Sequence, residues 1–296
     1  ILTLDVFHND SLQPGPDGRP DFAAERFLYL GDQANMPYGN YANVGKVDYL
    51  RELILKDTVF LLGNRYHQDG MVRRDKPPVK AIVIACNTAT AYGLEDIKAL
   101  VKKLDVPVIV VGVVEAGARG LLSTDIDPDG AIGVMATVGT CASEVYPRTV
   151  QSTLGRAGRS IASITQFGSA DLAAIIEGDP AIERSASEQV TLDVRALVEA
   201  HRAGAKPGAE ATPPLSTIIL GCTHFPLVLE EIDSAFTQLR RDPDFAPYIA
   251  EKRAYIDPAE WTARQLFREL ASAKLRVPAG GATELDRDLF FLSVVS

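Results

Sequence analysis

The chain has 296 residues, enough for two ordinary domains or one large α/β domain, and 46% of them are apolar, which supplies a sizeable core. Its formal net charge of -9 argues against nucleic acid as the main partner, because phosphate binding needs a basic face. A small anionic substrate stays compatible, since a local site can be positive in an acidic protein. With three scattered cysteines and no apolar run as long as a membrane span, we expect a cytoplasmic protein without a disulfide framework or a membrane partner.

The predicted elements alternate between strands and helices along the chain. Apolar runs predict strands at 26–32, 81–85, 107–114, 131–137, 217–221 and 253–257, with a short one inside 160–167. Helical periodicity predicts helices at 44–62, 90–104, 141–154, 181–201, 227–239 and 258–273, with another starting at 171–177. Proline, glycine and polar residues predict connecting loops at 13–20, 67–78 and 202–214.

Most of the predicted strands are continuous apolar runs rather than alternating ones. Continuous runs between helices are typical of parallel sheets that are covered on both faces. We therefore expect an α/β fold with doubly wound, parallel-rich sheets. Ligands of such sheets bind beyond the carboxyl ends of the strands.

Two segments of the chain are near-copies of one pattern. AIVIACNTATAYGLEDI (81–97) and TIILGCTHFPLVLEEI (217–232) each run from an apolar strand through a cysteine and a threonine-containing turn into a helix. The two copies lie far apart, which favours two related half-structures rather than a repeat array. Each half would then carry one thiol, Cys86 or Cys222, at the tip of a strand.

A cysteine at the start of a helix is expected to have a lowered pKa, because the helix N-terminus favours the thiolate. The free N–H groups of the same turn can hold a carboxylate. Asn87, Thr88, Thr90 and Thr223 add short polar side chains to the two turns. Each motif thus offers a reactive thiol beside a site for an anion.

Each of these residues also has a purely structural interpretation. Free cysteine is among the most often buried residue types, and Cys141 has no matching context, so we interpret it as structural. Asn87 and Thr88 could be helix caps. His224 could be an ordinary surface or core histidine, or it could tune the thiol of Cys222 two residues away. The duplicated context is what favours function for Cys86 and Cys222.

Several reactions use cysteine, and they fit this pattern unequally. A thiol oxidoreductase favours a C-x-x-C pair, which the chain lacks. A zinc site needs about four ligands, whereas Cys86, Cys222 and His224 supply three without regular spacing. A cysteine hydrolase leaves the second thiol unexplained. Two thiols on opposite sides of one substrate carbon suit stereoinversion, in which one removes a proton and the other delivers one.

The motifs together resemble the cofactor-independent aspartate/glutamate racemase family, and within it the glutamate racemases. The resemblance covers most of the chain. It is carried by YLGDQANMPYG (29–39), ACNTAT (85–90), GVVEAG (112–117), GVMATVGT (133–140), LGCTHFP (220–226) and YIDPAEWTA (255–263). The histidine after Cys-Thr makes the second cysteine motif resemble that of glutamate rather than aspartate racemases.

The resemblance implies an isomerase that interconverts L- and D-glutamate by two-base proton transfer at Cα and supplies D-glutamate for peptidoglycan in the bacterial cytoplasm. It implies no cofactor and no metal; glutamate is the implied partner, and a homodimer is compatible with it. Two doubly wound α/β domains related by pseudo-twofold symmetry would hold the active site in the cleft between them. The first domain would comprise residues 1–112 plus 254–296, and the second residues 113–253.

The resemblance also implies a set of site residues. The catalytic residues would be the thiols Cys86 and Cys222, with His224 supporting Cys222 and Glu177 orienting His224. The residues that bind substrate would be Pro37, Tyr38, Gly39, Asn87, Thr88, Thr137, Thr140 and Thr223.

One motif of the family has no counterpart here. The family begins with a strand ending in Asp-Ser-Gly, whereas ILTLDVFHND (1–10) is similar to the rest of the helix that follows it, and Asp5 and Asp10 lie in the wrong context to substitute. We expect the native chain to contain residues before Ile1. The alternatives that stay open are a racemase for aspartate or another acidic amino acid, a catalytically inactive binding relative, and a thiol redox or metal protein.

Overall fold

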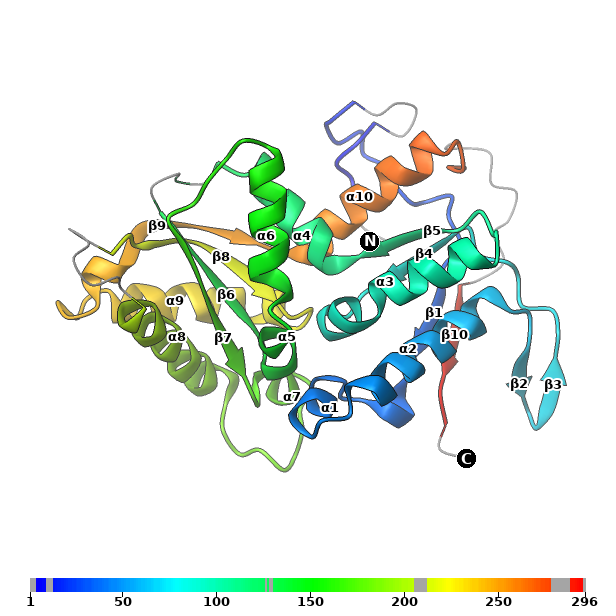
Figure 1. The fold of residues 1–296 in the computed structure, drawn as a ribbon, viewed down its shortest axis with the longest axis horizontal. Coiled ribbons are helices and arrows are strands. Elements are labelled where there is room, and N and C mark those ends of the chain that lie inside the picture. Colours follow the sequence, from blue (N-terminus) through cyan, green and yellow to red (C-terminus); the bar gives the residue numbers. More distant parts are fainter. Residues whose placement is uncertain are drawn as a thin grey trace.

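Figure 1 shows a computed structural model of the chain, which describes residues 4–8, 13–125, 127, 130–204, 212–277 and 288–294. Asp10 and much of the loop predicted at 202–214 lie outside these residues. The structure is an α/β fold whose larger sheets are parallel, which confirms the predicted fold class.

The largest sheet has four parallel strands in the order β7 (Ser163–Ser169), β6 (Ala131–Thr137), β8 (Leu215–Gly221) and β9 (Ile249–Ile256). Successive side chains of a strand point to opposite faces, so each face of this sheet has its own core. Met135 and Leu220 pack with helices α8 (Ala186–Ala203) and α9 (Leu229–Leu239). Val134 and Ala136 pack on the other face with α4 (Val113–Ser123) and α6 (Val145–Arg156).

A second group of elements surrounds the parallel pair β4 (Ala81–Ile84) and β5 (Ile109–Gly112). One face packs against α2 (Val47–Leu62) and α3 (Asn87–Lys103), and the other against α10 (Pro258–Ser272). Beside them, β1 (Leu28–Gly31) pairs in parallel with β10 (Leu289–Leu292), a strand that the sequence analysis did not predict. Both groups thus have apolar strands covered on two faces, as the continuous runs predict.

The loop predicted at 67–78 is wrong for part of its length. Strands β2 (Tyr66–Gln68) and β3 (Met71–Arg73) form an antiparallel hairpin there. Asp69 and Gly70 connect the strands with φ values of 52° and 75°. Positive φ at both residues is typical of the two-residue turn that Asp-Gly favours, so the turn signal was present in the sequence.

The helix predicted at 141–154 is two helices. A short α5 (Val138–Ala142) precedes α6, and Glu144 between them has a φ of 54°, which interrupts the helix. The residues 4–8 are not helical either: Phe7 forms a bridge with Pro14, and both Asp5 carboxylate oxygens accept hydrogen bonds from the backbone of residues 17 and 18. The remaining short helical segments are η1 (Gln33–Asn35), α1 (Gly39–Asn43), α7 (Leu172–Ile176), η2 (Phe225–Val228) and η3 (Ala246–Tyr248).

Capping residues explain where helices of this fold begin. Ser185 caps α8 with a capping box, in which its side chain accepts from the Glu188 N–H and the Glu188 side chain accepts from the Ser185 N–H. This cap begins the helix at residue 186 rather than at 181. Among the helices of the described residues, none is long and apolar enough to cross a membrane.

Candidate active site

The polar turns predicted at the strand ends meet in space. Cys86 lies two residues after the end of β4, Thr137 is the last residue of β6, and Cys222 directly follows β8. Figure 1 shows α5, which starts after Thr137, lying against both α1 and α3, and these contacts join the two groups of elements. The carboxyl ends of β4, β6 and β8 therefore face a shared region, as expected for the ligand site of a parallel α/β fold.

Three threonine hydroxyls form a triangle in this region. The Oγ1 atoms of Thr88 and Thr140 are 3.1 Å apart, those of Thr137 and Thr140 are 3.0 Å apart, and those of Thr88 and Thr137 are 3.4 Å apart. Thr88 lies in the first turn of α3, whereas Thr137 caps α5 through its contact with the Thr140 N–H. Each hydroxyl has one proton and two lone pairs, so the triangle can offer hydrogen bonds to a ligand by rotating its protons.

The Asn87 side chain is held in one orientation by Tyr146. The Tyr146 hydroxyl donates to Asn87 Oδ1 over 2.6 Å, and both residues are buried. Burial raises the pKa of Tyr146 well above its usual value, so the hydroxyl keeps its proton and stays a donor. The other end of the amide, Asn87 Nδ2, is buried without a hydrogen-bond partner. A buried unpaired donor is costly, and an acceptor on a bound ligand would satisfy it.

Replacing Tyr146 by Phe should therefore raise KM by up to about tenfold with kcat changed less, because one net hydrogen bond is worth about 1 kcal/mol and Asn87 would lose its fixed orientation. Steady-state kinetics measure this. Tyr255→Phe is the matched control, since its hydroxyl donates to Asp233 on α9 and not to a site residue. An unchanged KM in Tyr146→Phe would contradict the role of this contact.

Cys86 occupies the N-cap of α3. Its Sγ accepts from the Ala89 N–H over 3.5 Å, and hydrogen bonds from Ala89 and Thr88 lower its pKa. Burial acts in the opposite direction and is stronger, so the net pKa of the Cys86 thiol is raised. The expected lowering of this pKa is thus wrong as a net effect, because the helix N-terminus does not outweigh the loss of water around the sulfur.

Cys222 is 7% exposed, and burial raises the pKa of its thiol to about 12. Hydrogen bonds from the backbone N–H groups of His224 and Phe225 lower this pKa, whereas the negative charges of Cys86 and Glu177 raise it. The effect of Cys86 means that the two sulfurs lie within electrostatic range of each other. Ionising one thiol consequently favours the protonated form of the other, which is the pairing that a two-base reaction uses.

His224 connects Cys222 to Glu177. Its Nδ1 lies 3.6 Å from Cys222 Sγ, and its Nε2 lies 2.7 Å from Glu177 Oε1. With Nε2–H donating to the carboxylate, Nδ1 of the neutral ring can accept the thiol proton. The imidazolium that results would lie between two negative groups, which stabilises it. The structure brings together these three residues, although Glu177 ends α7 and the other two follow β8.

The turn at 37–39 reaches the same region through its backbone. A Cβ built on Gly39 would lie 3.6 Å from Thr137 Oγ1, and one built on Gly139 would lie 2.6 Å from the Gly39 carbonyl oxygen. The second distance is too short for any side chain, so Gly139 permits the close approach of α1 and α5. Pro37 is exposed and Gly39 half-buried, whereas the Tyr38 ring is buried with its hydroxyl on two carboxylates. Thr223 is exposed beside Cys222.

The sequence analysis missed Tyr146 and the carboxylates that bind the Tyr38 hydroxyl, Asp32 and Asp57. Tyr146 lies 59 residues from Asn87 along the chain, so no local spacing indicates that they touch. Cys141 is half-buried, and burial raises the pKa of its thiol to about 12. All three cysteines are free thiols, and no three His, Cys, Asp or Glu side chains among the described residues could hold a metal ion together.

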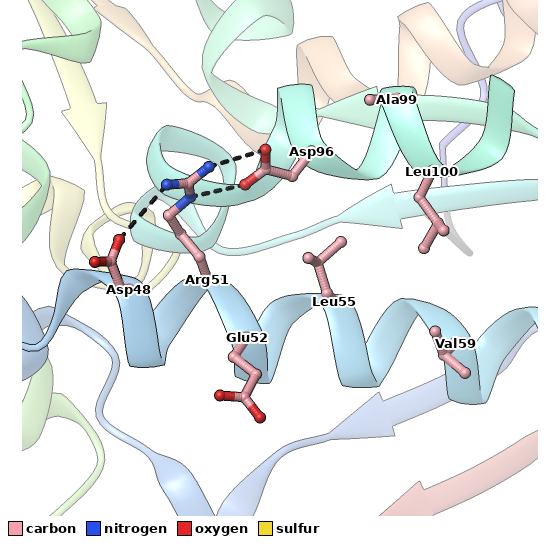
Figure 2. Close-up of a pocket in the computed structure, with 8 residues that line it drawn as sticks. All are labelled: Asp48, Arg51, Glu52, Leu55, Val59, Asp96, Ala99 and Leu100. Atoms are coloured by element: carbon pink, nitrogen blue, oxygen red, sulfur yellow. Dashed lines mark hydrogen bonds and ion pairs between the residues drawn. The ribbon is translucent and has the colours of Figure 1, made fainter. Parts of the chain in front are cut away.

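A groove of about 500 Å³ lies elsewhere, between α2 and α3 (Figure 2). The Arg51 guanidinium crosses it to both carboxylate oxygens of Asp96, at 2.8 and 3.0 Å. Apolar side chains, among them Leu55 and Leu100, line the rest. None of the predicted site residues lines this groove.

Comparison with known proteins identifies the family. Residues 67–266 match the family model of the Asp/Glu/hydantoin racemases, and this match includes both cysteine motifs. The chain belongs to the Asp/Glu/hydantoin racemase family. This racemase-family chain is 33% identical to a glutamate racemase of Limosilactobacillus fermentum over 238 aligned residues. The aligned stretch covers 80% of this chain and 68% of that protein. The predicted resemblance is thereby confirmed.

Solved structures of the racemase family have the same fold. The glutamate racemase isoform RacE1 of Bacillus anthracis matches with a TM-score of 0.66 and 24% identity, over 93% of this chain and 81% of that one. The glutamate racemase of Francisella tularensis, solved in complex with D-glutamate, matches with a TM-score of 0.57 and 21% identity, over 92% and 80%. At these sequence identities, the structural comparison shows that the fold is shared.

Proposed function

We propose that the protein is a glutamate racemase that interconverts L- and D-glutamate with Cys86 and Cys222 as the two bases. The observation that carries the proposal is the position of the half-buried Cys86 and the buried Cys222 just beyond the carboxyl ends of β4 and β8, where the charge of Cys86 acts on Cys222. One thiolate would remove the Cα proton from one face, and the opposite thiol would deliver a proton to the other face. Running the reaction backwards exchanges the two roles, so neither enantiomer is favoured.

Burial raises the pKa of both thiols, so the proposed reaction needs a source of thiolate. For Cys222 the source would be proton transfer to His224 Nδ1, with Glu177 stabilising the imidazolium. For Cys86 the N–H groups of Thr88 and Ala89 would stabilise the thiolate once its proton has left to water. The ammonium group of a bound amino acid would lower the pKa of both thiols further, since an opposite charge favours the ionised form.

The substrate would be held by polar groups around the thiols. Asn87 Nδ2 is a buried donor that lacks a protein acceptor, and the hydroxyls of Thr88, Thr137 and Thr140 converge nearby. We assign these groups to the substrate's carboxylates and ammonium, with Thr223 and the backbone of Pro37, Tyr38 and Gly39 completing the site. Donors that are fixed before the reaction stabilise the charge that develops on the carboxylate side of Cα.

The domain arrangement and the cellular role are part of the same proposal. The two domains would comprise residues 1–112 plus 254–296 and residues 113–253, with pseudo-twofold symmetry and the site in the cleft between them. The Thr88–Thr140 contact supports this, because it joins residues from the two expected domains. D-glutamate for peptidoglycan, a bacterial cytoplasmic location and a homodimer belong to the proposal.

A second candidate is a racemase of the same fold that acts on aspartate. His224 after Cys-Thr favours glutamate, because at this position the second cysteine motif resembles that of glutamate rather than aspartate racemases.

Circular dichroism under reducing conditions tests the proposal. The signal of D-glutamate should decay to zero rotation, and L-glutamate should give the mirror-image curve. Decay with aspartate alone would favour the second candidate. A signal that persists with both amino acids would refute racemisation of either.

A further inference from the structure

A second polar cluster lies beneath the turn that carries Pro37, Tyr38 and Gly39. The Tyr38 hydroxyl contacts Asp32 Oδ2 at 2.5 Å and Asp57 Oδ2 at 2.9 Å. Tyr38 and Asp32 are 5% and 9% exposed, and Asp57 on α2 is half-buried. Water therefore screens these contacts little, and the three groups interact strongly.

Counting protons defines the state of this cluster. A tyrosine hydroxyl has one proton to donate, and an ionised carboxylate can only accept. Two ionised carboxylates on one hydroxyl would leave one contact without a proton and place two like charges together. A second proton on Asp57 resolves this, because the Asp57 carboxyl then donates to the Tyr38 oxygen while Tyr38 donates to Asp32. Burial, together with the charge of Asp32, outweighs the opposing effect of the Tyr38 hydrogen bond and raises the pKa of Asp57 to about 6, so this arrangement is favoured at low pH.

The cluster continues into the segment that leads to the turn. Asn35 Nδ2 donates to Asp32 Oδ1 over 2.8 Å, and the Tyr41 hydroxyl donates to the Asn35 carbonyl over 3.0 Å. Hydrogen bonds thus connect Asp57 on the long helix α2 to residues on both sides of the 37–39 turn. The same turn lies against Thr137 and Gly139.

We propose that Asp57 is a positioning residue: through a proton shared with Tyr38 and Asp32, it fixes the 37–39 turn against Thr137 and so sets the affinity of the site for its amino acid. The inference rests on the proposed function only for the identity of the ligand. The cluster itself is defined by the contacts of Asp57, Tyr38 and Asp32.

The cluster should make binding depend on pH. Ionisation of Asp57 removes the shared proton, so affinity should fall several-fold as the pH rises through about 6. In the described residues, Asp32 and Tyr38 are the groups whose charges and hydrogen bonds act on Asp57. The neighbouring charge on α2, Arg51, is paired with Asp48 and with Asp96 of α3, and on α1 the Tyr41 hydroxyl is engaged by Asn35.

Two variants of Asp57 separate positioning from folding. Asp57→Asn retains a donor toward Tyr38 at every pH, so it should bind as wild type does at low pH and lose the pH dependence near 6. Asp57→Ala removes the donor and should raise Kd about tenfold, with kcat changed by no more than about two-fold. Asp48→Asn is the matched control on the same helix, because its side chain is 98% exposed, and it should keep the wild-type pH dependence.

The experiment is calorimetric titration of each variant with D-glutamate between pH 5 and 8, together with KM and kcat by circular dichroism. The pattern expected is a pH-dependent Kd in wild type and Asp48→Asn, a pH-independent Kd in Asp57→Asn, and weak binding in Asp57→Ala. Equal Kd values for Asp57→Ala and wild type at pH 5, where wild-type Asp57 carries its proton, would overturn the inference. A wild type that binds D-glutamate without racemising it would count against the proposed function and leave the binding test intact.

Discussion

Cys86→Ala and Cys222→Ala should each lose at least about a thousand-fold in the rate of glutamate racemisation. General acid–base groups contribute about 10² to 10⁴ in rate, and the proposed reaction has no other group that can reach the opposite face of Cα. Removing the acid or the base therefore stops inversion in both directions. Circular dichroism of both enantiomers measures the loss directly.

Deuterium exchange at Cα makes the test specific for two bases. The thiol that remains in a single variant can still remove a proton from its own face and return a deuteron to that face. We expect each variant to exchange one enantiomer with retention of configuration, and the two variants to select opposite enantiomers. Nuclear magnetic resonance of glutamate in deuterium oxide follows this exchange without requiring inversion.

Cys141→Ala provides the matched control, because it removes the third thiol of the chain, which is half-buried and lies outside the duplicated cysteine motif. Its rate should stay within about two-fold of wild type. Substantial inversion by either Cys86→Ala or Cys222→Ala would refute the two-thiol assignment. Exchange of both enantiomers by one variant would indicate another base.

The features that sequence predicted well are those set by local patterns. The continuous apolar runs of β4, β6 and β8 gave strands and their parallel arrangement, because such runs are stable only when both faces are covered. The duplicated cysteine context pointed to Cys86 and Cys222, and the strand-end rule placed them in one region. Helix α10, which Asp257 caps, begins at Pro258 as predicted.

The features that sequence missed depend on contacts between distant residues. Tyr146 orients Asn87, and Asp57 meets Tyr38, through pairings that no spacing along the chain encodes. The net pKa of Cys86 also required the structure, because the helix N-terminus and burial act in opposite directions and only the degree of burial decides between them. Strand β10 was missed for the same reason, because it is defined by its pairing with the distant strand β1.

His224→Ala should lower kcat by about a hundred-fold, because it removes the group that accepts the Cys222 proton at 3.6 Å and leaves a thiol with a pKa of about 12. The equilibrium constant of a racemisation is one, so kcat/KM must fall equally in both directions. Deuterium exchange should instead be unequal, with the loss concentrated on the enantiomer whose proton Cys222 removes. Steady-state kinetics and exchange in deuterium oxide measure the two effects separately.

Glu177→Gln should have a smaller effect, because two influences of this carboxylate oppose each other. Its charge stabilises a His224 imidazolium at 2.7 Å, whereas the same charge raises the pKa of Cys222 from farther away. Coulomb energy falls with distance, so the direct contact dominates and activity should decrease. The Glu177 side chain is 59% exposed, and exposed pairs are worth about 0.2–1 kcal/mol, which predicts a loss of activity of about 1.4- to 5-fold.

Ionic strength and a variant of a nearby carboxylate test whether Glu177 acts through its charge. High ionic strength should reduce the difference between wild type and Glu177→Gln, because exposed charges are screened. Glu183→Gln, which neutralises an exposed carboxylate in the same loop region, should leave kcat unchanged. If Glu177→Gln were as slow as His224→Ala, the charge of Glu177 would be worth far more than that of an exposed pair, and the small effect expected here would be wrong.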